Sequence, residues 1–164
     1  MQGKMFGFEG VKRAAVVGAL CVLMAACAQT RPELAGGANN IAAGTTQDFS
    51  VNVGDRIYFL NDQTSLSADA QAVLNKQAQW LKAFPSYKVT IEGHADERGT
   101  RQYNIALGAR RAAATKDYLV ARGVSAQRIN TISYGKERPV AVCNAETCWS
   151  QNRRAVTVLT STGS

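Results

Sequence analysis

A strand pattern that runs into a glycine-bracketed turn and then a long helix constrains this chain most. In residues 87–92 apolar and polar side chains alternate, so a strand with one apolar face is predicted. Residues 93–99 form the turn, which begins and ends with glycine and carries charged side chains. Thr100 is the expected N-cap of a helix over residues 101–122, which Gly123 is predicted to end.

Charged and polar side chains gather where this strand ends and the helix begins. Asn104, Leu107 and Arg111 are spaced so that they share one helix face, and Asp96 follows the strand. A carboxylate, a guanidinium and helix N-terminal amides can therefore converge on a small ligand that has both an ammonium and a carboxylate group. The ammonium would pair with Asp96. The pattern fits equally well an internal ion pair between the strand end and the helix.

The stretch at residues 93–112, GHADERGTRQYNIALGARRA, closely resembles the signature of OmpA-like peptidoglycan-binding domains. Within them it is most similar to the peptidoglycan-associated lipoproteins of the Tol-Pal system. The resemblance continues through SYGKERP and NRRA and covers roughly residues 51–160. It implies a domain that holds the diaminopimelate side chain of the stem peptide without hydrolysing it and without a cofactor. It also implies docking on the TolB propeller and a role in envelope constriction during division.

The resemblance also implies which side chains contact peptidoglycan. Carried over by position, they are Asp62, Asp96, Arg98, Asn104, Leu107 and Arg111. In the family a Phe-Asp pair reaches the ligand from the loop that contains Asp62. Here Asn61 replaces the aromatic residue, and Leu60 replaces an acid that often precedes it. From the residues alone, Asp62 fits turn formation equally well.

The N-terminal stretch predicts export and lipid attachment. Residues 1–26 have a basic start followed by an uncharged apolar run, shorter than the ~20 residues that a membrane-spanning helix needs. The run ends LMAAC, which resembles the lipobox of bacterial lipoproteins, with Met24 where leucine is commonest. This implies acylation of Cys27; the other interpretation is an ordinary secretory signal. Because Ala28 and not aspartate follows, the resemblance implies an anchor on the periplasmic face of the outer membrane.

Residues 27–48 are predicted to be the acylated cysteine and a flexible tether, because they are rich in small and polar residues without a sustained period. Residues 49–164 are predicted to be the peptidoglycan-binding domain. The formal net charge is +7, but the basic residues are scattered among acids and no aromatic stacking motif accompanies them. No nucleic-acid partner is therefore expected, whereas a basic face suits an anionic wall or membrane.

The remaining patterns predict an α/β (α+β) domain with the element order βαβαββ. A first helix begins after Ser67, its expected N-cap, and ends before Pro85. Two crossover helices imply mixed strand pairing with right-handed connections. We expect a two-layer sandwich, as in the OmpA-like fold, with two helices on one face of a mixed four-stranded sheet. The strand candidates are residues 49–60, 87–92, 128–135 and 154–160.

The cysteines and the single histidine are the residues to consider for a disulfide, a metal site or a catalytic site. Cys143 and Cys148 lie close in sequence, and in an exported chain they predict a disulfide that contributes ~2 kcal/mol. A metal site would need more ligands than this pair and His94 supply. The sequence shows no catalytic cluster around His94, so we expect it to have a structural role in supporting the loop. We therefore predict a binding protein. The alternatives are an envelope enzyme acting on peptidoglycan and the wall-binding tail of a porin or motor stator.

Overall fold

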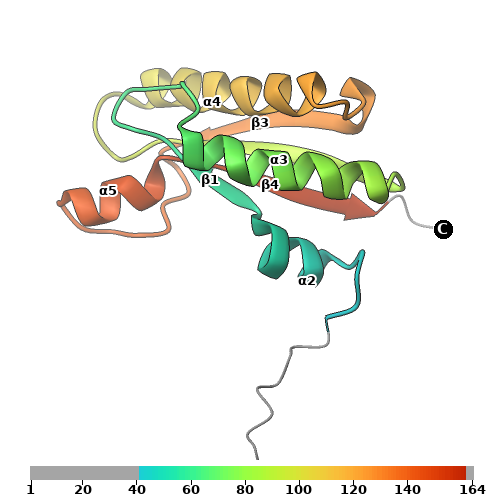
Figure 1. The fold of residues 1–164 in the computed structure, drawn as a ribbon. Helices are drawn as coiled ribbons and strands as arrows, with labels where there is room; N and C mark the ends of the chain where they lie inside the picture. Colours follow the sequence, from blue (N-terminus) through green and yellow to red (C-terminus); the bar gives the residue numbers. More distant parts are fainter. Residues whose placement is uncertain (1–40, 162–164) are drawn as a thin grey trace, which may run out of the picture. The chain divides into compact units, whose positions relative to one another are not determined.

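The computed structural model describes residues 41–161, which fold around one four-stranded sheet in the order β1-β4-β2-β3 (Figure 1). Strand β2 pairs in parallel with β3 and antiparallel with β4, and β4 pairs antiparallel with β1. The predicted mixed four-stranded sheet is confirmed. The strands are β1 (Arg56–Tyr58), β2 (Tyr87–His94), β3 (Ile129–Gly135) and β4 (Arg154–Ser161).

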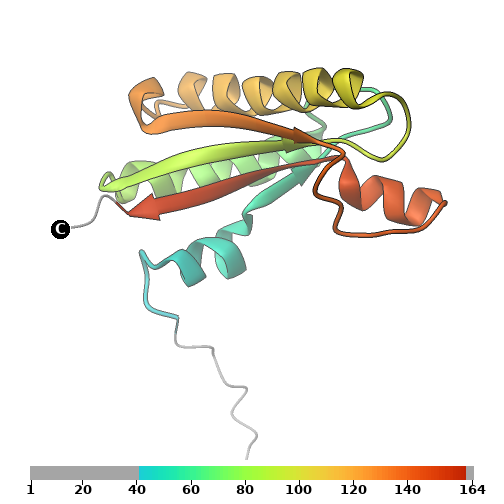
Figure 2. The same ribbon diagram turned by 180° about the vertical axis from the view of Figure 1, so that it is seen from behind.

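Two long helices cover one face of the sheet, α3 (Ala68–Ala83) and α4 (Arg101–Ala121); in Figure 2 the strands lie in front of α3, and α4 runs above them. Both predicted N-caps are confirmed, because the side chains of Ser67 and Thr100 accept hydrogen bonds from backbone amides of the first turns. Gly123 follows α4 with a φ of 92°, the left-handed conformation typical of a helix end. A 3-10 turn (Ala126–Arg128) leads into β3. No helix among residues 41–161 is both long and apolar enough to cross a membrane.

The first predicted strand is wrong in its N-terminal half. A short helix α2 (Thr46–Asp48) continues into a π-helix (Phe49–Gly54), and β1 begins only at Arg56. The reason lies in packing: the ring of Phe49 is buried against Trp80 at 5.0 Å, and the Asp48 carboxylate accepts the Trp80 indole N–H at 2.8 Å. Packing against the domain therefore includes Asp48, the last residue of the predicted tether. The tether residues 27–40 lie outside the described residues.

Two glycines let α4 rest directly on β2. A Cβ atom at Gly93 would lie 1.9 Å from the carbonyl oxygen of Gly108, and one at Gly108 would lie 2.4 Å from the hydroxyl oxygen of Ser133. Ser133 in turn donates to the carbonyl of Ile105 on α4 at 2.7 Å. This close approach fixes the start of α4 beside the carboxyl end of β2, where the predicted ligand contacts lie.

The connection from β3 to β4 contains a helix that the sequence did not predict, α5 (Glu146–Asn152). It is short, and its N-cap, Ala145, has no side-chain hydrogen bond. A disulfide joins Cys143 to Cys148, with Cα atoms 5.7 Å apart. The buried amide of Asn152 binds the backbone of Val140 and Ala141, so the segment before α5 is tied to the C-terminal end of that helix.

Candidate functional site

A cavity of about 350 Å³ lies where β2 ends and α4 begins, and we call it the β2–α4 cavity. Every predicted ligand position except Arg111 lines it. The lining residues are Asn61, Asp62, Asp96, Arg98, Gly99, Tyr103, Asn104 and Leu107. The connection between β1 and α3, the turn after β2 and the first turns of α4 thus form its walls.

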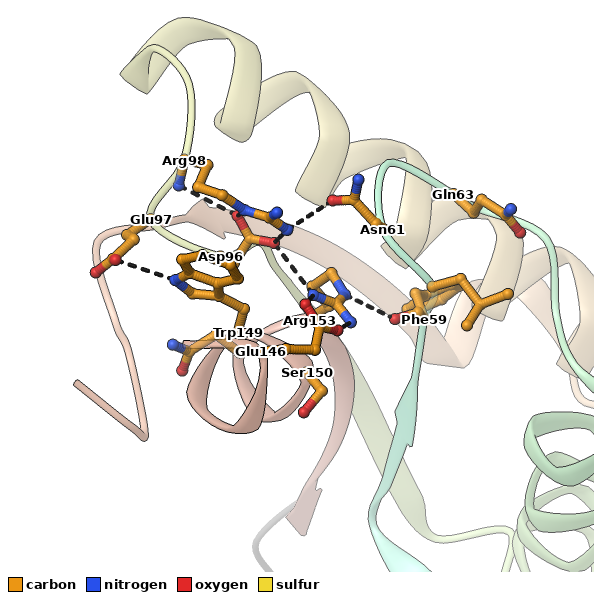
Figure 3. A network of polar contacts seen from close by, with 12 residues as sticks. Phe59, Asn61, Gln63, Asp96, Glu97, Arg98, Glu146, Trp149, Ser150 and Arg153 are labelled. Carbon is orange, nitrogen blue, oxygen red and sulfur yellow. Dashed lines mark hydrogen bonds and ion pairs between the residues drawn. The ribbon is translucent and has the colours of Figure 1, made fainter. Parts of the chain in front are cut away.

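Asp96 is the buried carboxylate of this cavity, with 7% of its surface exposed (Figure 3). Its oxygens accept from the backbone N–H and Nε of Arg98, both at 3.1 Å, from Nη2 of Arg98 at 2.6 Å and from Nη1 of Arg153 at 3.5 Å. Burial alone would raise its pKa, but the bonds and charge of Arg98, with that of Arg153, outweigh burial and hold the pKa below its ordinary value. Asp96 is therefore an anion at neutral pH.

Arg98 is the cavity's accessible guanidinium, with 38% of its side chain exposed. Besides binding Asp96, its Nη2 donates to the side-chain oxygen of Asn61 at 2.7 Å, and its guanidinium carbon lies over the ring of Trp149, 4.2 Å from the ring centroid. The backbone carbonyl of Arg98 accepts from the Asn104 amide at 2.7 Å. Among residues 41–161, Nη1 of Arg98 has no hydrogen-bond partner, so its N–H groups can donate to a ligand.

Arg111 has a different place from the one predicted. It is fully buried, and its three nitrogens donate to the carbonyls of Gln63 at 2.9 Å, His94 at 2.8 Å and Leu60 at 3.2 Å. Burial, and then the nearby charge of Arg153, lowers the pKa of Arg111 to about 10, so it stays charged at neutral pH. The expectation that Arg111 offers its guanidinium to a ligand carboxylate does not fit this geometry. Arg111 instead ties the loop after β1 to the end of β2.

The rest of the cavity lining includes two predicted residues, Asp62 and Leu107, and two that were not predicted as ligand contacts, Asn61 and Tyr103. Tyr103 donates its hydroxyl proton to the carboxylate of Asp62, whose φ of 55° places it in the left-handed region. Asp62 therefore has the turn conformation that was one alternative for it, and it also lines the cavity, while its contact with a ligand stays a prediction. Leu107, 5% exposed, adds an apolar surface, and Asn61 uses its side chain to hold Arg98.

The sequence did not single out three residues that support the site, Trp149, Glu146 and Arg153. Arg153 is 4% exposed, donates Nε to the carbonyl of Phe59 at 3.1 Å and pairs with Glu146 as well as with Asp96. A signal was present: two consecutive arginines, Arg153 and Arg154, stand where β4 begins, and buried cations need acidic partners. Nothing in the sequence indicated which acids those were.

The burial of His94 agrees with the structural role that we expect for it. The ring is 2% exposed and lies 5.6 Å from the ring of Tyr134, and neither ring nitrogen has a hydrogen-bond partner among residues 41–161. Glu92 comes only to 3.7 Å. Burial, followed by the charges of Arg154 and Arg138, lowers the pKa of His94 to about 4. The imidazole is therefore neutral at physiological pH.

We predict that acid destabilises the protein through His94. A pKa that falls from about 6.5 unfolded to about 4 folded means that the unfolded chain binds more protons between these values. The stability contribution is complete above pH 6.5 and is lost as the pH falls toward 4, by about 3 kcal/mol. Urea unfolding from pH 7 to 4.5 measures it. His94→Phe should flatten the slope; an equally steep slope in this variant would contradict the assignment.

A second, larger cavity of about 620 Å³ lies between the end of β1, the start of α3 and α5, and we call it the β1–α5 cavity. It contains none of the predicted ligand positions. Asp69 and Glu146 are its carboxylates, and Arg153, which also lines it, is paired with Glu146. Within residues 41–161, no group of histidine, cysteine and carboxylate side chains is arranged to hold a metal ion.

The sequence of this chain is similar to those of known proteins. The profile of the OmpA family matches residues 58–154. The chain is 69% identical to the peptidoglycan-associated lipoprotein of Rhizobium meliloti over 128 residues, which are 78% of this chain and 73% of the relative. It is 60% identical to that of Agrobacterium fabrum, covering 88% of this chain and 85% of the relative.

Solved structures give the same fold. The crystal structure of the peptidoglycan-associated lipoprotein from Burkholderia pseudomallei superposes with a TM-score of 0.66 at 39% identity and covers 70% of this chain and 98% of that one. The C-terminal domain of Helicobacter pylori MotB superposes with a TM-score of 0.61 at 20% identity, covering 65% of this chain and 84% of that one. At this low identity, the similarity to MotB shows only that the two proteins share a fold.

Proposed function

Because the chain belongs to the OmpA family and, within it, to the peptidoglycan-associated lipoproteins, we propose that it grips the diaminopimelate side chain of peptidoglycan non-covalently in the β2–α4 cavity. It is a binding protein and not an enzyme, as are the members of its family. The observation that supports this proposal most is the pairing of a buried anion, Asp96, with an accessible guanidinium, Arg98, on one cavity.

The ligand's charges match these two groups. The end of the diaminopimelate side chain carries an ammonium and a carboxylate on the same carbon atom. The ammonium pairs with Asp96, whose pKa keeps it charged, and the carboxylate accepts from Nη1 of Arg98. Leu107 packs against the methylene chain. Arg111, by holding the loop that carries Asp62, keeps the cavity's far wall in place.

Affinity comes from several weak contacts and many sites. Single exposed ion pairs contribute only about 0–1 kcal/mol, and Arg98 is partly exposed. A protein held at a membrane meets a wall that repeats the same stem peptide many times, so rebinding raises the effective affinity. A moderate affinity at each site is compatible with firm attachment to the wall.

The same membership motivates a role in the envelope. Residues 1–26 act as a lipoprotein signal, Cys27 is acylated, and residues 27–48 link this anchor to the domain over 49–164. Cys27 lies outside the described residues. The lipid anchors the protein to the periplasmic face of the outer membrane, and the cavity ties that membrane to peptidoglycan. As part of the Tol-Pal system, docking on TolB, the protein supports envelope integrity and the invagination of the outer membrane during division.

We predict that the full-length chain sediments with purified peptidoglycan that contains diaminopimelate. On a wall with lysine at the same position, the ligand lacks the carboxylate that Arg98 binds, and retention should fall about three- to fivefold, the equivalent of one partly exposed ion pair of up to about 1 kcal/mol. Co-sedimentation on both walls, with the bound fraction measured across protein concentrations, checks this. Equal retention on the two walls, or none on either, would refute the proposal.

A further inference from the structure

We propose that Trp149 is a positioning residue for the β2–α4 cavity, holding the Arg98 guanidinium in the orientation that pairs with Asp96 and leaves Nη1 for a ligand carboxylate. The inference rests on the proposed function for its ligand. The arrangement of Trp149, Arg98 and Asp96 that the proposal explains does not itself depend on a ligand. Trp149 lies on α5 and does not line the cavity, so it acts through Arg98.

Arg98 needs such a support because a partly exposed arginine side chain has many rotamers. Asp96 and Asn61 fix two of its nitrogens by hydrogen bonds, but these contacts lie in the guanidinium plane. Trp149 contributes the contact on the face, with the guanidinium carbon 4.2 Å from the ring centroid (Figure 3). In-plane and facial contacts together restrict both the position and the tilt of the group.

The indole is itself oriented by the turn that carries the ligand contacts. Its Nε1 donates to the carboxylate of Glu97 at 3.0 Å, and Glu97 lies between Asp96 and Arg98 in the chain. The ring thus contacts two consecutive residues of this turn, Glu97 and Arg98. A ring that served only to cover α5 would not need a partner on this turn.

The backbone of Trp149 is held independently of its ring. The disulfide to Cys143 fixes the preceding residue, Cys148. The backbone amide of Trp149 donates to Ala145 at 3.0 Å, and its carbonyl accepts from Arg153 at 3.1 Å. We therefore expect α5 to keep its position when the ring is removed. The effect of a substitution at Trp149 should then come from the change at Arg98.

The test compares Trp149→Leu, which keeps an apolar side chain without a ring, with Trp149→Phe, which keeps a ring face. A soluble muropeptide with diaminopimelate is titrated into each full-length protein by calorimetry. We expect about fivefold weaker binding for Trp149→Leu and less than about twofold for Trp149→Phe, the range of a cation–π contact at a partly exposed site. Gln151→Ala, on the same helix, is the matched control and should bind like the unchanged protein.

Two readouts separate positioning from general destabilisation. For a muropeptide with lysine, Trp149→Leu should leave the affinity unchanged, because no carboxylate meets Arg98. Without ligand, carbon-13 NMR titration should show the pKa of Asp96 rising toward its ordinary value in Trp149→Leu and staying low in Trp149→Phe. An unchanged Asp96 pKa in Trp149→Leu, or equal losses in the two variants, would overturn the proposal. If the unchanged protein binds no muropeptide, the proposed function fails, and the Asp96 titration still decides the role of Trp149.

Discussion

Replacing Asp96 with asparagine is expected to weaken binding of a soluble diaminopimelate muropeptide about 100-fold. The substitution keeps the shape of the side chain and removes the charge that the ligand ammonium needs. Asp96 is 7% exposed and its pKa lies below the ordinary value, so the lost ion pair is a largely desolvated one. Losing one partner of such a pair typically costs about 2–5 kcal/mol, and 100-fold corresponds to about 2.7 kcal/mol.

Isothermal calorimetry on the full-length chain measures this loss, with thermal unfolding run in parallel, because Arg98 and Arg153 also lose an acceptor. The matched control is Asp69→Asn, the same substitution at an exposed carboxylate of the β1–α5 cavity. It should bind normally. If Asp69→Asn lost affinity and Asp96→Asn did not, the ligand would lie in the β1–α5 cavity and the site proposed here would be wrong.

Replacing Arg111 with methionine is expected to destabilise the fold by about 3–5 kcal/mol. Methionine fills much of the volume but donates no hydrogen bond, so the carbonyls of Leu60, Gln63 and His94 lose their donor. Each buried acceptor left without a partner costs about 1–3 kcal/mol, and the relief of one buried charge offsets part of the sum. The loop after β1 should then detach from the end of β2.

Urea unfolding at pH 7 measures the change in the free energy of unfolding. Arg110→Met alters the neighbouring, exposed residue of α4 and should change stability by less than about 0.5 kcal/mol. An Arg111→Met protein that is as stable as the unchanged one would show that the three carbonyl contacts contribute little. If it were stable yet failed to bind muropeptide, Arg111 would be a ligand contact as the sequence predicted.

Local patterns predicted the elements that place the site. Alternation in β2, the cap at Thr100 and the stop at Gly123 depend on neighbours in the chain, and each is found where predicted. The grouping of Asp96, Arg98, Asn104 and Leu107 on one cavity follows from the same strand–turn–helix unit. Periodicity is reliable for such units because the constraint is local.

Contacts between distant segments were not predictable in the same way. Helical spacing placed Arg111 on the right face of α4, but the acceptors of its hydrogen bonds are carbonyls of other segments, which no side-chain pattern records. Likewise, the alternation of Val51 and Val53 indicated a strand, yet the contact of Phe49 with Trp80 stabilises a helical turn there. In the second case tertiary packing overrode local preference.

Helix α5 and its contacts with the site were not predictable from the sequence for the same reason. Its sequence is short and has no capping side chain, and its role depends on Trp149 reaching Arg98 and Glu97 across the fold. A resemblance that included Asn152 to Ala155 marked the neighbourhood but assigned no function to Arg153. Only the structure brings Arg153 within 3.5 Å of Asp96.

The most direct test of the central claim is to locate the ligand by NMR. Titrating the labelled full-length chain with soluble diaminopimelate muropeptide should produce saturable shifts in the Asp96 carboxyl carbon and the Arg98 guanidinium nitrogens, which line the β2–α4 cavity. The lysine muropeptide should shift Asp96 and leave Arg98 nearly unchanged. Shifts confined to residues of the β1–α5 cavity, or no saturable shift at Asp96 and Arg98, would contradict the claim that these two charges hold the ligand.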